Sequence, residues 1–196
     1  MDNSSFFDNL APIWDDNEIL STPDKVNEIL DYFSIGESEE ILDLGTGTGI
    51  LLPYIAERIG EHGRITAVDY SEGMLKRAKH KYNYLKPKPL FLKKDFEKEP
   101  VEGTFDKIIL YCVYPHLNKP LECLKKLKDN NLKMKGEIFI AFPTGPDYIN
   151  NIHKDRKSES DLLPTASLLN SFFNKNGLKA EVLAENDGAY VVKIKK

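Results

Sequence analysis

The sequence predicts an α/β protein with a doubly wound sheet of seven strands, mostly parallel, that ends in an antiparallel hairpin. From residue 40 to residue 142, short apolar runs alternate with helical patterns, and the connections between them are short. This alternation is typical of parallel strands joined by right-handed crossovers. The C-terminal part differs, because two apolar runs are joined through Asn186-Asp187-Gly188. Asp-Gly between apolar runs is a strong hairpin signal.

The elements follow from the apolar pattern, taken in chain order. Ile41, Leu42 and Leu44 form an apolar run with no polar face, which is typical of a strand covered on both sides. The seven expected strands are residues 40–44, 64–69, 90–92, 105–111, 136–142, 178–184 and 189–195. The expected helices are one at 49–59, one capped by Ser71, one carrying Leu121, Leu124 and Leu127, and one at 165–176.

An N-terminal helical segment, residues 1–35, precedes the first strand and cannot belong to its βαβ unit. The side chains of Phe6, Leu10, Ile13 and Trp14 fall on one face at helical spacing. This face predicts either a helix packed on the outside or a lid over the site. A second helix is expected at 24–35, after a start signal from Thr22-Pro23.

Length and composition indicate a single globular domain over residues 1–196, with residues 36–196 as its core. The chain is 41% hydrophobic and 30% charged, and its net charge of −4 gives no general attraction to nucleic acid or anionic membranes. The N-terminus does not resemble a signal peptide, and no apolar run approaches the length of a membrane span. We therefore expect a cytoplasmic protein, with no membrane or nucleic-acid partner, that is a monomer or a homodimer.

A glycine turn follows the first strand. Gly45, Gly47 and Gly49 alternate with threonines, so no Cβ obstructs a close approach of the backbone to a ligand. The turn leads into a helix, whose free N–H groups suit a polar, usually anionic, part of a nucleotide-like cofactor. The pattern is not the dinucleotide fingerprint G-x-G-x-x-G, and the chain lacks a second domain for a hydride-transfer substrate.

Three carboxylates are expected near the same ligand. Asp43 stands two residues before Gly45, Asp69 ends the second strand, and Asp95 follows the third. In an open α/β sheet, ligands bind outside the carboxyl ends of the strands. Asp69 is at the right place to accept hydrogen bonds from both ribose hydroxyls of a nucleoside.

These motifs resemble those of class I S-adenosylmethionine-dependent methyltransferases. The resemblance covers residues 36–142, and the sequences that carry it are Asp43-Leu-Gly-Thr-Gly-Thr-Gly49, Asp69-Tyr-Ser-Glu-Gly-Met74-Leu75, Lys94-Asp95-Phe96 and Phe105-Asp106-Lys-Ile-Ile. It implies a Rossmann-like fold and S-adenosylmethionine as cofactor. The segment from Phe6 to Asp15 is also similar to the N-terminal segment of ubiquinone/menaquinone-type methyltransferases, with Trp14 in place of a tyrosine.

The resemblance also implies which residues bind the cofactor. Asp43 holds its amino end, Asp69 takes the ribose hydroxyls, and Asp95 accepts from the adenine amino group. The complete expected set is Trp14, Asp43, Gly45, Thr46, Gly47, Gly49, Asp69, Tyr70, Met74, Asp95, Phe96 and Tyr111.

The expected reaction is methyl transfer to a small-molecule acceptor by in-line displacement, in which alignment of the acceptor supplies much of the rate. The resemblance implies that Tyr111 lies near the methyl group. His116 or His153 is a candidate general base, each with the alternative of a structural histidine. The substrate-side loops are expected at 111–118 and 143–164.

Several alternatives stay open at this point. The acceptor is otherwise a protein or a nucleic acid, although Tyr111-Cys-Val-Tyr-Pro-His116 departs from the N/D-P-P-Y/F string of base-amine methyltransferases. A further alternative is a non-catalytic S-adenosylmethionine-binding module. No metal is expected, since Cys112, His116, His153 and Asp161 lack short ligand spacing. Cys112 is interpreted as a small buried hydrophobe rather than a nucleophile.

Overall fold

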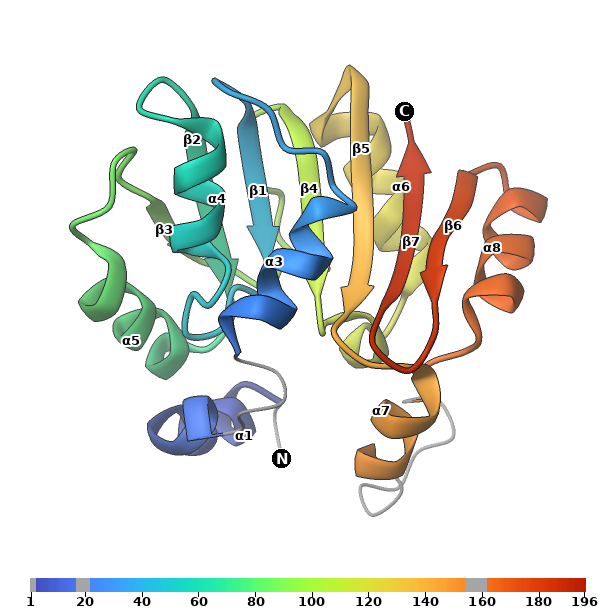
Figure 1. Ribbon diagram of the computed structural model, residues 1–196, viewed down its shortest axis with the longest axis horizontal. Coiled ribbons are helices and arrows are strands. Elements are labelled where there is room, and N and C mark those ends of the chain that lie inside the picture. The colour runs from blue at the N-terminus through green and yellow to red at the C-terminus, as the bar shows by residue number, and fades with distance from the viewer. Residues whose placement is uncertain (1–2, 17–21, 154–161) are drawn as a thin grey trace.

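The computed structural model describes residues 3–16, 22–153 and 162–196 (Figure 1). Their sheet has seven strands in the order β3-β2-β1-β4-β5-β7-β6. The strands are β1 (Glu40–Leu44), β2 (Arg64–Asp69), β3 (Leu90–Lys93), β4 (Phe105–Tyr111), β5 (Leu132–Phe142), β6 (Lys179–Glu185) and β7 (Tyr190–Lys195). Strands β1 to β5 pair in parallel, and β7 is antiparallel to both β5 and β6. The predicted fold class is confirmed.

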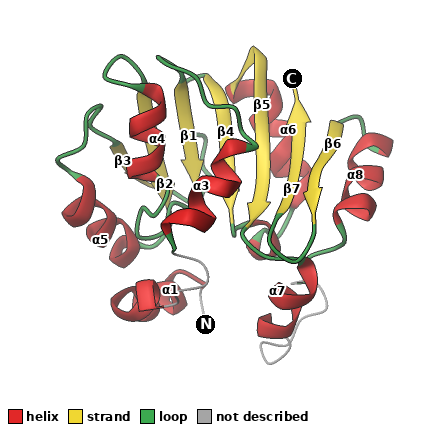
Figure 2. Cartoon of the chain, viewed as in Figure 1, coloured by secondary structure: helices red, strands yellow, loops and turns green. Residues whose placement is uncertain are grey.

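Helices cover both faces of the sheet (Figure 2). The α-helices are α1 (Asn3–Leu10), α3 (Pro23–Asp31), α4 (Leu52–Ile59), α5 (Glu72–Tyr82), α6 (Pro120–Asn131), α7 (Pro146–His153) and α8 (Ala166–Lys175), and the 3₁₀ helices are η1 (Ala11–Asp16) and η2 (Tyr114–His116). One core cluster joins α3 and α4 to the sheet, and a second joins α6 and α8 to the opposite face.

Strand β1 buries apolar side chains on both faces of the sheet. Ile41 belongs to the cluster beneath α3 and α4, whereas Leu42 and Leu44 belong to the cluster on the α6 side. All three side chains are fully buried. Burial of an aliphatic side chain of this size stabilises the fold by about 1.5–3 kcal/mol. A polar substitution on either face of this strand would lose that stabilisation.

The carboxyl ends of β1, β2, β4 and β5 lie at one edge of the sheet. Figure 1 shows α1 and α7 beyond this edge, where they flank the loops that follow the strands. The N-terminal segment is therefore placed beside the loops that carry the glycine turn and the predicted carboxylates.

The structure breaks the expected N-terminal helical face in two. Helix α1 ends at Leu10, and the chain continues as the 3₁₀ helix η1. Pro12 explains the change, because its ring clashes with the carbonyl four residues earlier and it has no N–H for an α-helical bond. As a result Ile13 is 59% exposed, whereas Leu10 is half-buried.

Other elements also differ from the sequence expectation. Helix α3 ends at Asp31 rather than at residue 35, and residues 146–153 of the expected loop form helix α7. Strand β5 begins at Leu132, four residues earlier than predicted, because Leu132 pairs with Phe105 across a register shift.

The early start of β5 depends on the buried side chain of Asn131, the last residue of α6. Its Nδ2 donates to the carbonyl of Val101 at 2.7 Å and to that of Gly103 at 2.9 Å. These bonds connect the helix end to the loop before β4. Helix α6 runs directly into β5, with no residue between the two elements.

Replacement of Asn131 by Asp removes both donors with little change in shape. We expect Asn131→Asp to lower the free energy of unfolding by about 1–3 kcal/mol, since the buried carbonyl of Val101 and the part-buried bond to Gly103 lose their donor. Urea denaturation measures this. Asn176→Ala is the control, because it removes only one exposed side-chain bond, to Phe172, and a comparable loss in both variants would contradict the role of Asn131.

Candidate functional site

The glycine turn after β1 is shaped by two different requirements. Gly45 has φ +68°, and a Cβ there would lie 2.5 Å from Cγ2 of Val113, so the loop after β4 packs directly on it. Gly47 has φ +55°, but a Cβ there would have only Nε1 of Trp14 within 4 Å, at 3.8 Å. Gly45 thus closes a packing contact, whereas Gly47 leaves space for a ligand against the backbone.

Asp69 holds the turn in this shape. Its Oδ2 accepts from the backbone N–H of Gly47 at 2.8 Å, and its Oδ1 accepts from that of Ser71 at 2.9 Å. The side chain is buried, and burial raises the pKa of this carboxyl while the backbone bonds oppose the rise. The carboxylate therefore joins the turn after β1 to the start of α5.

Asp43 lies beside it at the end of β1. Its Oδ2 accepts from the Thr46 hydroxyl at 2.6 Å, and its side chain is almost fully buried. Burial raises the pKa of Asp43 to about 7; the Thr46 bond lowers it, and the nearby charge of Asp69 raises it. The two carboxylates thus form an electrostatically unfavourable pair that a bound cation would stabilise.

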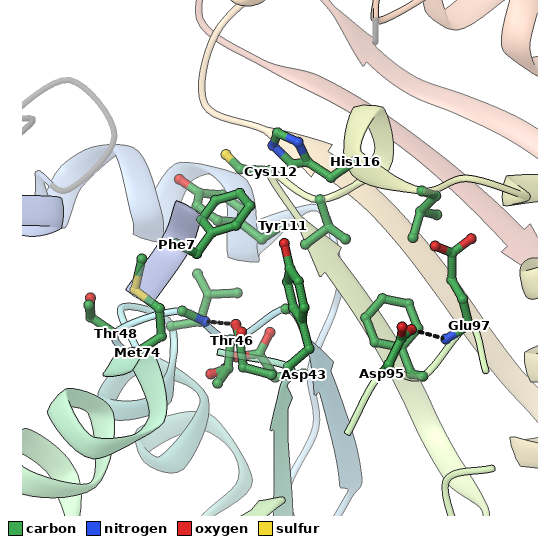
Figure 3. A pocket seen from close by; sticks show the side chains of 18 of the residues that line it. Phe7, Asp43, Thr46, Thr48, Met74, Asp95, Glu97, Tyr111, Cys112 and His116 are labelled. Carbon is green, nitrogen blue, oxygen red and sulfur yellow. Dashed lines mark hydrogen bonds between the residues drawn. The ribbon is translucent and has the colours of Figure 1, made fainter. Parts of the chain in front are cut away.

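A cavity of about 390 Å³ lies over this turn. Most residues expected from the sequence line it, namely Trp14, Asp43, Gly45, Thr46, Gly47, Asp69, Tyr70, Met74, Asp95, Phe96, Tyr111 and His116. Figure 3 shows Phe7, Cys112 and His116 at one end of the cavity and Asp95 and Glu97 at the other, with Asp43 and Thr46 between them.

Two of the expected site residues are not among those that line the cavity. A Cβ on Gly49 would lie 2.8 Å from Cδ1 of Leu52 and 2.9 Å from Cδ2 of Tyr82, so Gly49 allows close packing between the turn and α5. His153 is the last residue of α7, and its side chain lies outside the described part of the structure. The same holds for the alternative metal ligand Asp161.

The end of the cavity at β3 is built by a tight turn. The carboxylate of Asp95 accepts from the backbone of Glu97 at 3.2 Å and pairs with Lys98 at 2.7 Å. The carboxylate of Glu97 accepts from the backbone N–H groups of Asn118 and Lys119 at 3.1 and 2.8 Å. Glu97 therefore connects this turn to the loop that follows η2.

The other end is formed where β4 stops. Cys112 has φ +58°, a left-handed conformation that is uncommon for a residue with a side chain, and it turns the chain into η2. Burial raises the pKa of the Tyr111 phenol and of the Cys112 thiol. Both groups keep their protons at neutral pH, so Cys112 lacks the thiolate that a nucleophile requires.

Sequence reasoning missed part of the lining. The additional residues are Phe7, Thr48, Ile50, Leu51, Glu97 and Lys98, whereas Cys112, Val113, Leu117 and Asn118 lie within the substrate-side loop expected at 111–118. Most carry no chemical signal of their own. Phe7 lies within the N-terminal segment that is similar to other methyltransferases, but helical spacing indicated its neighbour Phe6 instead. Within the ranges described, no cluster of three or more His, Cys, Asp or Glu residues is suited to a metal.

The comparisons with known proteins concern the family and the fold. Residues 41–135 match the family model described as "Methyltransferase domain". A solved structure titled as a SAM dependent methyltransferase from Aquifex aeolicus is 25% identical, with a TM-score of 0.71 and 97% of each chain covered. The seven-stranded fold, the glycine turn and its buried carboxylates therefore define the class I methyltransferase fold. This chain is an S-adenosylmethionine-dependent methyltransferase of that class.

Curated relatives differ in the acceptors that their names give. A protein-L-isoaspartate O-methyltransferase of Fervidobacterium nodosum is 25% identical over 74% of this chain and 70% of the relative. A malonyl-[acyl-carrier protein] O-methyltransferase of Halalkalibacterium halodurans is 34% identical over 60% of this chain and 43% of the relative. None of the helices in the described ranges has the length and apolar character needed to cross a bilayer.

The raised pKa of Asp43 makes stability depend on pH. The unfolded carboxyl titrates near 3.8 and the folded one near 7, so its contribution is complete below the unfolded pKa and is lost as pH rises through the folded pKa. Relative to the wild type, Asp43→Asn should gain about 2–4 kcal/mol of unfolding free energy between pH 4 and 7. Urea unfolding at several pH values measures the difference.

Thr46→Val supplies the matched variant, because it removes the hydroxyl bond that lowers the Asp43 pKa. In this variant the stability contribution of Asp43 should be lost at a higher pH than in the wild type. A difference between Asp43→Asn and the wild type that does not change with pH would contradict this assignment.

Proposed function

We propose that this protein transfers a methyl group from S-adenosylmethionine to a small-molecule acceptor by in-line displacement. The observation that carries the proposal is the cavity at the carboxyl ends of the strands. Its volume of about 390 Å³ lies in the range of small-ligand sites. Phe7 and Trp14 contribute to its lining from the N-terminal segment.

The chain's own residues fit the cofactor. Gly47 leaves open space beside a backbone turn, and the buried pair of Asp43 and Asp69 favours a cation. In this proposal Asp43 holds the cationic amino end, and Asp69 uses its remaining lone pairs for the ribose hydroxyls. Both side chains are already oriented by hydrogen bonds, to Thr46 and to the backbone, so their positions require little reorganisation.

The adenine would occupy the end of the cavity beside β3. Phe96 lines the cavity and offers apolar surface, and its neighbour Asp95 lies at this end with a carboxylate acceptor. Met74 lines the cavity from α5, on the side of Phe7 in Figure 3. Met74 is almost completely buried, and its backbone N–H donates to the cap Ser71, so helix α5 fixes its position.

When bound, S-adenosylmethionine supplies a sulfonium methyl group, which moves to the acceptor nucleophile while the bonding pair returns to sulfur. The protein's main task is alignment of the acceptor, which is worth several kcal/mol. The protonated phenol of Tyr111 can donate a hydrogen bond or pack, but it cannot act as a base at neutral pH. His116 is the proposed base for an acceptor that must lose a proton, and His153 is the second candidate.

The proposal also includes the chemical class of the methyl acceptor. A net charge of −4 supports a small molecule over nucleic acid, because phosphate binding relies on cationic groups. The relatives named for isoaspartate and acyl-carrier-protein methylation make a protein-borne acceptor the alternative. A cytoplasmic location and a monomeric or homodimeric state are retained as predictions.

The role of Gly47 is testable with a glycine that shares its conformation. Gly47→Ala should weaken S-adenosylhomocysteine binding at least about 10-fold, because a methyl group there fills space at the ligand and strains a backbone with φ +55°. Gly177→Ala is the control, since Gly177 has φ +84° and no atom within 4 Å of an added Cβ. Calorimetry and urea unfolding compare the two.

We expect both glycine variants to lose about 1–2 kcal/mol of stability from backbone strain, and only Gly47→Ala to lose cofactor affinity. Equal affinity in the two variants would show that the cofactor does not pass over Gly47.

An acceptor screen with a tritiated methyl donor tests the proposed function itself. The panel contains small-molecule fractions, isoaspartyl peptides, malonyl-acyl-carrier protein and RNA. We expect label in the small-molecule fraction. Label confined to peptide, carrier protein or RNA would refute the acceptor class, and binding of the cofactor with no transfer to any fraction would favour a non-catalytic binding module.

A further inference from the structure

The N-terminal helix α1 is attached to the start of α5 through Asp8. Its Oδ1 accepts from the Ser71 hydroxyl at 2.6 Å and from the backbone N–H of Gly73 at 2.8 Å. A Cβ on Gly73 would lie 3.1 Å from the same oxygen and 3.4 Å from Cβ of Ala11, so only glycine allows this approach without a shift. The two bonds lower the pKa of Asp8, which therefore keeps its charge at neutral pH.

Asp8 places its neighbour Phe7 at the centre of an aromatic group. The ring of Phe7 lies 5.5 Å from Trp14, 5.8 Å from Tyr70 and 5.4 Å from His116, measured between centroids. These partners come from η1, from the segment after β2 and from η2, and all four side chains line the cavity. Phe7 is thus the contact through which the N-terminal segment meets the loop after β4.

The geometry of the contact with His116 is specific. The two rings are nearly perpendicular, at 84°, which is a favourable edge arrangement for aromatic groups. The backbone before His116 is fixed independently, by the left-handed turn at Cys112 and the packing of Val113 on Gly45. The backbone therefore sets where His116 starts, and Phe7 limits where its ring can turn.

We infer that Phe7 is a positioning residue: held by Asp8, it orients the ring of His116 at the acceptor end of the cavity. This inference rests on the proposed function for its meaning, because it concerns the group that would face the acceptor. The inference predicts that Asp8 and the imidazole of His116 are coupled. A change at Asp8, which makes its bonds to α5 and not to His116, alters the environment of the imidazole through Phe7.

Three variants test the coupling in the full chain. Phe7→Leu removes the ring, and Asp8→Asn weakens the attachment of α1. Asn9→Ala is the matched control, because Asn9 is an exposed neighbour on the same helix. Far-UV circular dichroism establishes that each variant is folded, and Asp8→Asn carries the test if Phe7→Leu does not fold.

Two readouts need neither a cofactor nor an acceptor. The imidazole resonances of His116, assigned by their loss in His116→Gln, report the ring current of Phe7. Trp14 is the single tryptophan of the chain and lies against Phe7, so its emission reports docking of the segment. We expect Phe7→Leu and Asp8→Asn to move both signals toward their values in an unfolded peptide, and Asn9→Ala to move neither.

The ligand readout separates this inference from the proposed function. Asp8→Asn should weaken S-adenosylhomocysteine binding about 3–10-fold, because the docked population of α1 falls. If Asp8→Asn leaves the His116 resonances where Asn9→Ala leaves them, the coupling is refuted. If the wild-type protein does not bind S-adenosylhomocysteine, the proposed function fails, while the His116 and Trp14 signals still decide the coupling.

Discussion

The carboxylate of Asp69 connects the loops on which the rest of the site depends. It accepts from the backbone of Gly47 in the glycine turn and from the backbone of Ser71 at the start of α5. Hydrogen bonds to a charged group contribute about 1.5–3 kcal/mol each. Ser71 in turn caps α5 and donates to Asp8, so one line of polar contacts runs from the glycine turn to the N-terminal helix. The same chain of hydrogen bonds therefore supports both the shape of the glycine turn and the docking of α1.

Most of the sheet could be predicted from local patterns. Buried runs such as Ile41–Leu44 and the Asp187-Gly188 turn act over a few residues, and the structure confirms the elements that they predict. The start of β5 at Leu132 could not be predicted in this way, because it depends on pairing with Phe105 and on the bonds of Asn131 to residues about 30 positions away. Helix α7 lacked a clear signal within a stretch interpreted as a loop.

The site shows the same division. The residue types and spacing of Asp43, Gly47 and Asp69 pointed to one edge of the sheet, where the cavity lies. The roles of Phe7 and Asp8 could not be read from the chain, since their partners are 63 to 65 positions away for Asp8 and further still for the contact with His116. Such contacts depend on how a separate segment docks, and no local periodicity encodes that.

The buried pair of Asp43 and Asp69 has a consequence for turnover. In the proposed reaction, methyl transfer removes the positive charge from sulfur but leaves the cationic amino end, so these two carboxylates would hold the product with one attraction fewer. Because burial already raises the pKa of Asp43 to about 7, this carboxyl can regain a proton at neutral pH once the cationic ligand departs. Within the proposed function, binding of either cationic ligand is therefore coupled to release of this proton, and the donor has the additional attraction of its sulfonium charge.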